Sequence, residues 1–509
     1  MNKHYYITTP IYYINDVPHI GHAYTTIAAD IMARFKRICE YDVFFLTGTD
    51  EHGQKVEKAA QMQGIHPREL ADRTVHRFID LWNTLNISNT GFIRTTEERH
   101  RKVVQYIFEK AFERGDIYLG SYEDWYCVPC ESYFTELQLK NGVHCPDCHR
   151  PTEKLKEESY FFKLSNYEDR LLKLLERQND FILPEIRFNE VASFIKGGLR
   201  DLSVSRTSFT WGIPVSMNTN HVVYVWFDAL ANYISGIGFL EDDDLFNTFW
   251  PCDAHLIGKD ILRFHAVYWP SFLISVGIPV PKHIFAHGWW TIEGQKMSKS
   301  LGNVIDPNEI VEQYGVDEFR FFLFREVPFG LDGDFSKNAI LHRVNGDLAN
   351  DFGNLVSRSA TMIGKFQKGK IGKPEKKGGT DEYVEAQIRS LTDRYCKDME
   401  VFSYYKALQH IFEITSTLNK YIDTEAPWKL AKENDPRVKT VLYNLWNGIR
   451  IAAMLIYPFM PKKSQSIWNA IGVRKPIENI HFDEERVFYH TDNIAEIGKV
   501  APIFPRIEG

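Results

Sequence analysis

The chain has 509 residues with a formal net charge of −7, and 44% of its residues are apolar and 25% charged. This composition is typical of a soluble globular protein of about three domains, and the acidic balance excludes a nucleic-acid binder with a uniformly basic surface. The first residues lack the apolar core of a secretory signal, and the longest apolar runs are broken or too short to span a bilayer. Seven cysteines, four of them in two close pairs, indicate a reducing compartment, so we expect a cytoplasmic protein with no membrane partner.

The first predicted element is an aromatic and β-branched strand over residues 5–13, which ends at a turn over residues 15–18. His19-Ile20-Gly21-His22 follows, and apolar residues then recur at helical spacing from Ile27 to Ile38. We expect a helix to begin just after the glycine, with both imidazoles on its first turn beside unpaired backbone N–H groups. Because a helix N-terminus favours anions, this corner predicts a nucleotide-phosphate site. Two histidines that only cap or pack a turn are the alternative, and a partner motif has to decide between the two.

A short apolar run over residues 42–46 predicts a strand covered on both faces, and a polar loop over residues 47–53 follows it. Strand, helix and strand in this order form a parallel unit with a right-handed crossover, and ligands bind outside the carboxyl ends of such strands. The loop therefore lies beside the two histidines, where Asp50 could hold a substrate ammonium group. The alternative is that the loop only caps the next helix, predicted over residues 54–63.

Two cysteine pairs lie further along the chain, Cys127 with Cys130 and Cys145 with Cys148, and 14 residues separate them. Four thiolates at this spacing converge tetrahedrally, which is the coordination that Zn²⁺ prefers. A closed shell of four thiolates leaves no open position, so we predict one structural zinc ion per chain rather than a catalytic one. Four cysteines without a metal are the alternative.

Parallel-sheet patterns return after the cysteine-bearing segment, at residues 222–228, 255–260 and 284–288. That segment is therefore interpreted as an insertion into one nucleotide-binding fold. From about residue 338 the pattern is helical, with two amphipathic helices between residues 384 and 422. The predicted fold class is α/β, with a Rossmann-type parallel-sheet catalytic domain that is interrupted by a zinc-knuckle insertion and followed by an all-α helical bundle.

The partner motif for the two histidines is Lys296-Met297-Ser298-Lys299-Ser300. Two lysines three residues apart in a short loop can clamp a triphosphate and neutralise the charge that develops on leaving pyrophosphate. Such a loop alone is more often a solvated surface turn. Its combination with His19-Ile20-Gly21-His22 on an interrupted parallel sheet favours the phosphate site.

These two motifs are the signatures of the class I aminoacyl-tRNA synthetases, and the chain resembles the methionyl-tRNA synthetases of bacterial type over essentially its whole length. The resemblance extends to residues 6–13, 47–53, 325–330 and 333–336. It implies that L-methionine is activated with ATP to methionyl-adenylate and pyrophosphate. It further implies transfer of methionine to the terminal adenosine of tRNA(Met), both initiator and elongator, with Mg²⁺ accompanying ATP and with no DNA partner.

The resemblance also assigns roles to individual residues. The implied catalytic residues are His19, Gly21, His22, Lys296 and Lys299. The implied ATP contacts are His19, His22, Arg206, Gly258, Lys259, Lys296, Met297, Ser298 and Lys299. The implied methionine pocket consists of Ile11, Tyr13, Asp50, Trp226, Ala229, Tyr233, Ile261 and His265. In the helical part, the residues implied to read the CAU anticodon are Asn354, Arg358 and Trp428.

The chemistry of methionine agrees with such a pocket. A thioether offers almost nothing to hydrogen-bond, so selection depends on aromatic rings shaped around the sulfur. Without the family, those aromatic residues would be expected in the core. Asn354 and Arg358 lie four apart on one helix face and Trp428 could stack on a base, but alone they are interpreted as a solvated face and a packing residue.

The predicted domain organisation has five parts. They are the first half of the catalytic domain over residues 1–117, the inserted connective domain over 118–214 with its zinc knuckle at about 122–155, the second half of the catalytic domain over 215–290, the K-M-S-K-S loop and stem-contact region over 291–345, and the helical anticodon-binding domain over 346–509. Many relatives continue into an appended tRNA-binding domain that makes them dimers. This sequence stops soon after residue 507 and shows no such appended domain, so we expect a monomer. The alternative is a shortened form of a longer dimeric parent.

Other class I synthetases are the nearest rival interpretation. The cysteine enzymes hold their substrate thiol with zinc, whereas the shell predicted here is closed, and the insertion of about residues 120–211 is too short for the editing domain of the valine, leucine and isoleucine enzymes. A non-catalytic tRNA- or zinc-binding relative has no use for both phosphate motifs. A small nucleotidyltransferase with an H-x-G-H site accounts for neither the length nor the helical last third of the chain.

Overall fold

The centre of the molecule is a sheet of seven parallel strands, and the computed structural model describes residues 3–14, 18–128, 132–134, 136–292, 294–296, 305–489, 495–498 and 500–508. Six strands follow in the order β2, β3, β1, β13, β14 and β8, and β4 pairs with β3 outside this path. The strands are β1 Lys3–Thr8, β2 Tyr12–Tyr13, β3 Tyr41–Asp50, β4 Gly91–Arg94, β8 Ile182–Leu183, β13 Ala254–Gly258 and β14 Ile284–His287. The prediction of a parallel α/β sheet is confirmed.

Neighbouring residues of the sheet belong to two different hydrophobic cores. Ile7 of β1 and Phe45 of β3 pack into a core that contains α1 (Ile20–Ile38) and the C-terminal helices. Tyr6 and Leu46, the neighbours of these residues, pack into a second core. Because side chains alternate along a strand, the sheet separates the two cores, as expected for parallel strands covered on both faces.

Helices cover both faces of this sheet and the connections between its strands. They are α2 Gln54–Met62, α3 Pro67–Thr84, α4 Glu98–Glu113, α5 Glu168–Arg177, α6 Glu185–Lys196, α7 Val225–Leu230, α8 Asn232–Ser235, α9 Asp243–Phe249, α10 Trp269–Val276, α11 Pro307–Tyr314 and α12 Val316–Glu326. A π-helical turn, Phe264–Tyr268, leads into α10. The helix predicted over residues 54–63 is thus confirmed as α2.

Two strand predictions near the N-terminus were partly wrong. The strand expected over residues 5–13 is divided into β1 and β2, with Pro10 between them, because proline has no N–H for the ladder. The loop expected from residue 47 instead continues β3 to Asp50, because Thr49 and Asp50 pair with Tyr12 and Tyr13 of β2.

The strand expected over residues 222–228 was also wrong in part. β12 (Asn218–Val223) ends the strand, and α7 begins at Val225. β12 pairs antiparallel with β10 (Ser205–Arg206) and β11 (Pro214–Val215), so it lies outside the parallel sheet. A continuous apolar run does not distinguish a buried strand from a short buried helix.

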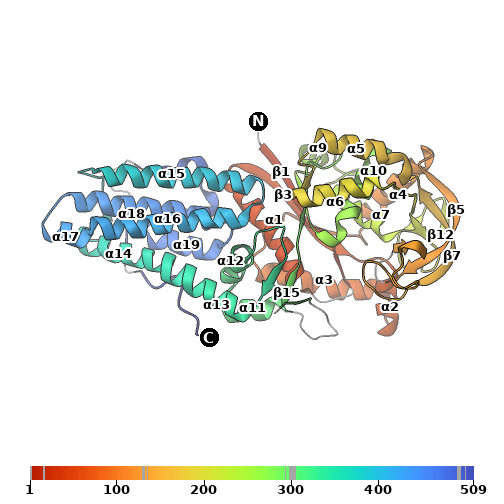
Figure 1. Ribbon diagram of the computed structural model, residues 1–509, viewed down its shortest axis with the longest axis horizontal. Coiled ribbons are helices and arrows are strands. Elements are labelled where there is room, and N and C mark those ends of the chain that lie inside the picture. Colours follow the sequence, from red (N-terminus) through yellow and green to blue (C-terminus); the bar gives the residue numbers. More distant parts are fainter. Residues whose placement is uncertain are drawn as a thin grey trace.

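The cysteine-bearing segment forms a separate antiparallel sheet, in the order β6, β5, β7, β9. Its strands are β5 Ile117–Cys127, β6 Ser132–Phe134, β7 Glu153–Phe162 and β9 Leu202–Ser203. β5 and β7 pair over ten residues, from Ile117 with Phe162 to Tyr126 with Glu153. In Figure 1 this sheet lies at the end of the molecule opposite the C-terminal helices.

The C-terminal third is helical, as predicted, and forms the other end of the elongated molecule (Figure 1). Its helices are α13 Lys337–Arg343, α14 Asn354–Gln367, α15 Gly379–Glu400, α16 Tyr404–Glu425, α17 Pro427–Lys432, α18 Arg437–Ile456, α19 Pro461–Ala470 and α20 Phe482–Glu485. A π-helical segment, Val344–Gly353, precedes α14. One small strand pair, β18 (Lys370–Ile371) with β19 (Ala495–Glu496), departs from the all-α expectation.

A buried ionic network joins α1 to the helical part. Asp30 Oδ2 accepts hydrogen bonds from Arg34 Nε and Arg320 Nη2, both at 2.7 Å. Arg320, on α12, also donates to the carbonyl groups of Pro458 and Phe459 in the turn after α18. The network therefore fixes the helix that begins at the two histidines against the C-terminal helices.

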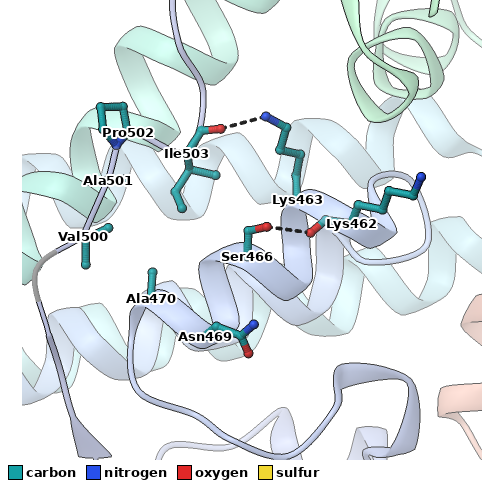
Figure 2. Close-up of a pocket in the computed structure, with 9 residues that line it drawn as sticks. All are labelled: Lys462, Lys463, Ser466, Asn469, Ala470, Val500, Ala501, Pro502 and Ile503. Atoms are coloured by element: carbon teal, nitrogen blue, oxygen red, sulfur yellow. Dashed lines mark hydrogen bonds between the residues drawn. The ribbon is translucent and has the colours of Figure 1, made fainter.

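Residues 500–503, close to the end of the described chain, run alongside α19 (Figure 2). Lys463 Nζ donates to the carbonyl oxygen of Ile503 at 2.8 Å. A cavity of about 500 Å³ lies between this segment and α19, and none of the predicted site residues lines it. No helix in the described ranges is long and apolar enough to cross a membrane.

Candidate functional site

The first turn of α1 is capped by its own two histidines. His19 is the N-cap residue, and its Nδ1 accepts a hydrogen bond from the backbone N–H of Gly21 at 3.1 Å. The Nδ1 atom of His22 accepts from the backbone N–H of His19 at 3.1 Å, so the two rings form a reciprocal capping box. The rings stack with their centroids 3.8 Å apart. A Cβ on Gly21 would lie 2.9 Å from His19 Cε1, so glycine leaves room for this ring.

The capping geometry determines where the imidazole protons lie. Burial, and to a lesser degree the neighbouring His19, lowers the pKa of His22 well below its ordinary value, so its ring is neutral at pH 7. A neutral ring whose Nδ1 accepts a hydrogen bond carries its proton on Nε2. Capping and phosphate binding are therefore compatible roles, because Nδ1 serves the helix and Nε2–H remains a donor.

His287, at the end of β14, contacts the next turn of α1 through Thr25. Its Nδ1 donates to the carbonyl oxygen of Gly288 at 2.8 Å, and its Nε2 accepts from the Thr25 hydroxyl at 2.6 Å. Burial lowers the pKa of His287, which agrees with this neutral tautomer. The start of α1 is thus held, through Thr25 in its second turn, to the carboxyl end of β14, where a parallel sheet places its ligands.

Five of the eight predicted methionine residues belong to, or pack against, one hydrophobic core. Ile11, Tyr13, Trp226 and Ile261 are partly buried against it, and Tyr233 belongs to its buried part. The remaining residues of the set, Ala229, Asp50 and His265, are 5%, 2% and 1% exposed. Tyr13 and Asp50 are register partners in β2 and β3, which brings the predicted ammonium-binding carboxylate beside an aromatic ring.

The donor and the acceptor of the hydrogen bond between Tyr233 and His265 can be assigned. His265 Nδ1 lies 2.9 Å from the carbonyl oxygen of Ile261, which can only accept, so Nδ1 carries the proton. Nε2 then accepts the Tyr233 hydroxyl proton over 2.7 Å. Burial lowers the pKa of His265 to about 4, so the ring stays neutral. Trp226 stacks on Phe264 with ring centroids 3.8 Å apart, which gives this region an aromatic wall.

Apart from the two histidines, the predicted ATP residues that the structure describes occupy three different places. Gly258 ends β13, and Lys259 follows it with Nζ 2.7 Å from Asp332 Oδ2 and 4.3 Å from the ring centroid of Trp289. Arg206 lies in β10, where it donates to Ser203 and stacks over Tyr224 at 4.4 Å. Lys296 ends β16 (Gln295–Lys296). Met297, Ser298 and Lys299 lie outside the described residues.

Three of the four predicted zinc ligands lie together. The Sγ atoms of Cys127, Cys145 and Cys148 all lie within 4.8 Å of one another, and those of Cys127 and Cys148 are 3.4 Å apart. Four sulfurs at about 2.3 Å from zinc would be about 3.8 Å apart, so this donor set fits a tetrahedral zinc ion. The backbone N–H of Cys148 donates to Cys145 Sγ at 3.5 Å, the kind of hydrogen bond that orients a metal ligand. Cys130 lies outside the described residues.

The predicted anticodon residues lie on the helical part, away from the histidines (Figure 1). Asn354, the first residue of α14, is exposed. Arg358, one turn on, has Nη2 at 3.3 Å from Asp423 Oδ1 near the end of α16. Trp428, on α17 just beyond α16, is 44% exposed. A tryptophan with this exposure is available to a partner and is not a core packing residue.

Sequence reasoning missed several residues that support the site. His287 ends a strand that was predicted, so the rule that ligands bind at carboxyl ends of parallel strands could have identified it. His100, inside α4, and Asp228, on α7, carry no comparable signal, because only the fold brings them together at 2.7 Å.

The interrupted parallel sheet, its histidine-capped first helix and the helical C-terminal part have the architecture of a class I aminoacyl-tRNA synthetase, and the family comparison shows that class. The family described as tRNA synthetases class I (M) matches residues 5–156 and 150–360. The family described as anticodon binding domain of methionyl tRNA ligase matches residues 371–487. The chain is 50% identical to the methionine–tRNA ligase of Caldanaerobacter subterraneus subsp. tengcongensis, over 100% of this chain and 80% of that protein.

Two further relatives extend the comparison. The methionine–tRNA ligase of Rickettsia felis is 48% identical, over 100% of this chain and 99% of that protein. A structure of Mycobacterium tuberculosis methionyl-tRNA synthetase in complex with methionyl-adenylate is 44% identical, with a TM-score of 0.95, over 99% of this chain and 100% of that one. The chain therefore belongs to the methionine–tRNA ligases.

Proposed function

We propose that the protein activates L-methionine with ATP and transfers it to the terminal adenosine of tRNA(Met), both initiator and elongator. The observation that carries this proposal is the first turn of α1. There, the Nδ1 atoms of His19 and His22 accept backbone N–H groups at 3.1 Å, and the neutral His22 ring carries its proton on Nε2, from which it can donate to a phosphate oxygen.

In the first step, a carboxylate oxygen of methionine attacks the α-phosphorus of ATP. The bond from this phosphorus to the bridging oxygen breaks, and pyrophosphate leaves. His19 and His22 hold phosphate oxygens, while Lys259, Lys296 and Lys299 neutralise the leaving group, with Gly21, Gly258, Met297 and Ser298 close to the nucleotide. Arg206 completes the ATP contacts. Mg²⁺ bound with ATP would add further charge neutralisation. Little acid–base chemistry is required, because positioning and charge stabilisation carry such transfers.

Methionine is held at both ends in this proposal. The carboxylate of Asp50 pairs with its ammonium group, and the side chain occupies the aromatic pocket. The pocket residues are Ile11, Tyr13, Trp226, Ala229, Tyr233, Ile261 and His265. A neutral His265 supports this role, because a charged imidazolium would be costly beside a thioether.

In the second step, the 2′-hydroxyl of the terminal adenosine attacks the activated carbonyl carbon, and AMP leaves. Asn354, Arg358 and Trp428 read the anticodon at the far end of the molecule. The proposed parts are catalytic halves over residues 1–117 and 215–290, an inserted connective domain over 118–214, a lysine-loop and stem-contact region over 291–345 and an anticodon-binding domain over 346–509. The enzyme acts as a monomer in the cytoplasm, where tRNA is charged for translation. It needs neither DNA nor a membrane.

The test is amino-acid-dependent exchange of labelled pyrophosphate into ATP, with each amino acid in turn and without tRNA. Exchange with methionine alone is the expected result. Exchange with another amino acid would support the phosphate site at His19 and His22 but contradict the assignment of the methionine pocket. No exchange with any amino acid, from folded zinc-loaded protein, would contradict the catalytic proposal.

The cysteine cluster is proposed to hold one structural zinc ion through Cys127, Cys130, Cys145 and Cys148. Cys145→Ser should lower the zinc content from about one per chain and lower the melting temperature, because structural zinc contributes directly to folding. Zinc is measured by elemental analysis of the purified protein. The matched control is Cys39→Ser, a half-buried cysteine at the end of α1, which should retain its zinc. Unchanged zinc and melting in Cys145→Ser would contradict a ligand role.

The anticodon assignment predicts a separation of the two reaction steps. Trp428→Ala should reduce kcat/KM for tRNA aminoacylation by about 10- to 100-fold, since loss of one stacked base costs about 1–3 kcal/mol. Pyrophosphate exchange should stay unchanged, because it involves no tRNA. A control is Tyr383→Ala, which removes another exposed aromatic ring, 61% exposed, from α15. Equal losses in both assays for Trp428→Ala would count against an anticodon role.

A further inference from the structure

One buried carboxylate lies between the parts of the proposed methionine pocket. Asp228 is 0% exposed, and both of its oxygens are used. Oδ2 lies 2.7 Å from His52 Nδ1, and Oδ1 lies 2.7 Å from His100 Nε2. Burial raises the pKa of the Asp228 carboxyl, but the two imidazoles outweigh burial and leave the pKa lowered. Asp228 is therefore an ionised acceptor that joins three chain segments.

Two of these segments carry pocket residues themselves, and the third, that of His100 in α4, contacts a further segment that does. His52 follows Asp50 by two residues at the end of β3. Asp228 itself lies on α7, next to Ala229 and two residues after Trp226. His100 leads to a third segment, because its Nδ1 lies 2.8 Å from the hydroxyl of Ser235, which lies on α8 two residues after Tyr233.

Trp211, from a further segment of the chain, contacts His52 and the residues on either side of it. The Trp211 ring packs against the His52 ring at 5.5 Å. Its Nε1 donates to the carbonyl oxygen of Glu51 at 2.6 Å, and its own carbonyl oxygen accepts from the Gly53 N–H at 3.0 Å. The segment that carries Asp50 is therefore anchored at its backbone and, through His52, at its side chains.

We infer that Asp228 is a positioning residue for methionine, which keeps the ammonium-binding carboxylate of Asp50 at a fixed separation from the side-chain pocket of Trp226, Ala229 and Tyr233. This inference rests on the proposed function of those residues. A free amino acid must satisfy both ends of the site at once, so a fixed separation of the two ends selects side-chain length. Loss of the link weakens methionine binding without touching the ATP site.

The experiment is steady-state pyrophosphate exchange by the full-length, zinc-loaded Asp228→Asn variant, normalised to active sites by the burst of adenylate formation. The KM for methionine should rise at least 10-fold while the KM for ATP stays within twofold. The preference for methionine over ethionine, which is one methylene longer, should fall. A lower fraction of active sites with an unchanged KM for methionine would overturn the inference, because a merely structural role predicts that result.

Three variants complete the design. Asp317→Asn is the matched control, because Asp317 is equally buried at 1% exposed but caps α19, and it should leave the KM for methionine unchanged. If Asp228→Asn does not fold, Ser235→Ala decides, since it removes only the hydrogen bond of Ser235 with His100. A two- to fivefold rise in the KM for methionine supports the inference, and no rise overturns it.

Asp50→Asn tests the proposed pocket separately. An unchanged KM for methionine in that variant would contradict the pocket itself, and with it the inference.

Discussion

His22→Asn should lower kcat for methionine-dependent pyrophosphate exchange by about 10²–10³-fold, which is the usual cost of removing one donor to developing charge. The Asn side-chain oxygen can take the place of Nδ1 and accept the backbone N–H of His19, now 3.1 Å from that nitrogen. The variant has no donor at the position of Nε2. The helix cap is thus retained while the proposed phosphate contact is lost, so the melting temperature should stay close to that of the wild type.

His22→Gln is the complementary variant. Its amide nitrogen can reach the position of Nε2, but it leaves the backbone N–H of His19 without its acceptor. We expect most of the exchange activity to remain and the stability to fall by about 1 kcal/mol, the usual cost of a lost cap. Calorimetry and exchange kinetics on both variants separate the two roles. Equal activity losses in both would show that the Nε2 donor is not what the reaction uses.

The second large effect concerns the buried network at Asp30. Asp30→Ala should destabilise the protein by about 3–5 kcal/mol, because it leaves the buried guanidinium groups of Arg34 and Arg320 without their shared carboxylate. Urea unfolding followed by circular dichroism measures the change. The control is Glu69→Ala, which breaks the exposed pair of Glu69 with Arg73 on α3 and should cost at most about 1 kcal/mol.

The Asp30 effect should also depend on pH. Burial raises the pKa of this carboxyl, but Arg34 and Arg320 outweigh burial and hold the pKa well below its usual range. A depressed pKa means that the stabilisation is present above the unfolded-state pKa of about 3.9 and is lost as the pH falls below it. The difference between the wild type and Asp30→Ala should therefore shrink on acidification from pH 6 to below pH 4. A difference that grows on acidification would contradict this assignment.

Local sequence was sufficient to predict a structural feature wherever all the residues that cause that feature lie in one short segment. The histidines of residues 19–22 adjoin a helical pattern, so the helix start followed from neighbouring residues, and the same residues carry the prediction of an anion site. Cys145 and Cys148 behaved in the same way, since C-x2-C spacing keeps the two sulfurs close, and they lie together with Cys127. The amphipathic pattern between residues 384 and 422 likewise predicted α15 and α16.

Sequence reasoning failed where pairing partners decide the structure. Residues 47–50 are polar enough for a loop, yet they extend β3 because β2 is present to pair with them. Residues 222–228 are apolar enough for one strand, yet the chain changes to a helix at Val225 because α7 packs into the buried core. Periodicity describes the burial of a segment and does not identify its hydrogen-bond partners.

The sequence by itself therefore determined the family and the order of sheet and bundle, and it supplied the predictions of the phosphate site and the zinc ligands, because each motif depends on residues close together in the chain. Only the tertiary structure decided how the site is supported. Asp228 meets His52 across 176 residues, and Thr25 meets His287 across 262 residues. Such contacts depend on how the strands are ordered in the sheet, and no local pattern of residue types encodes that order.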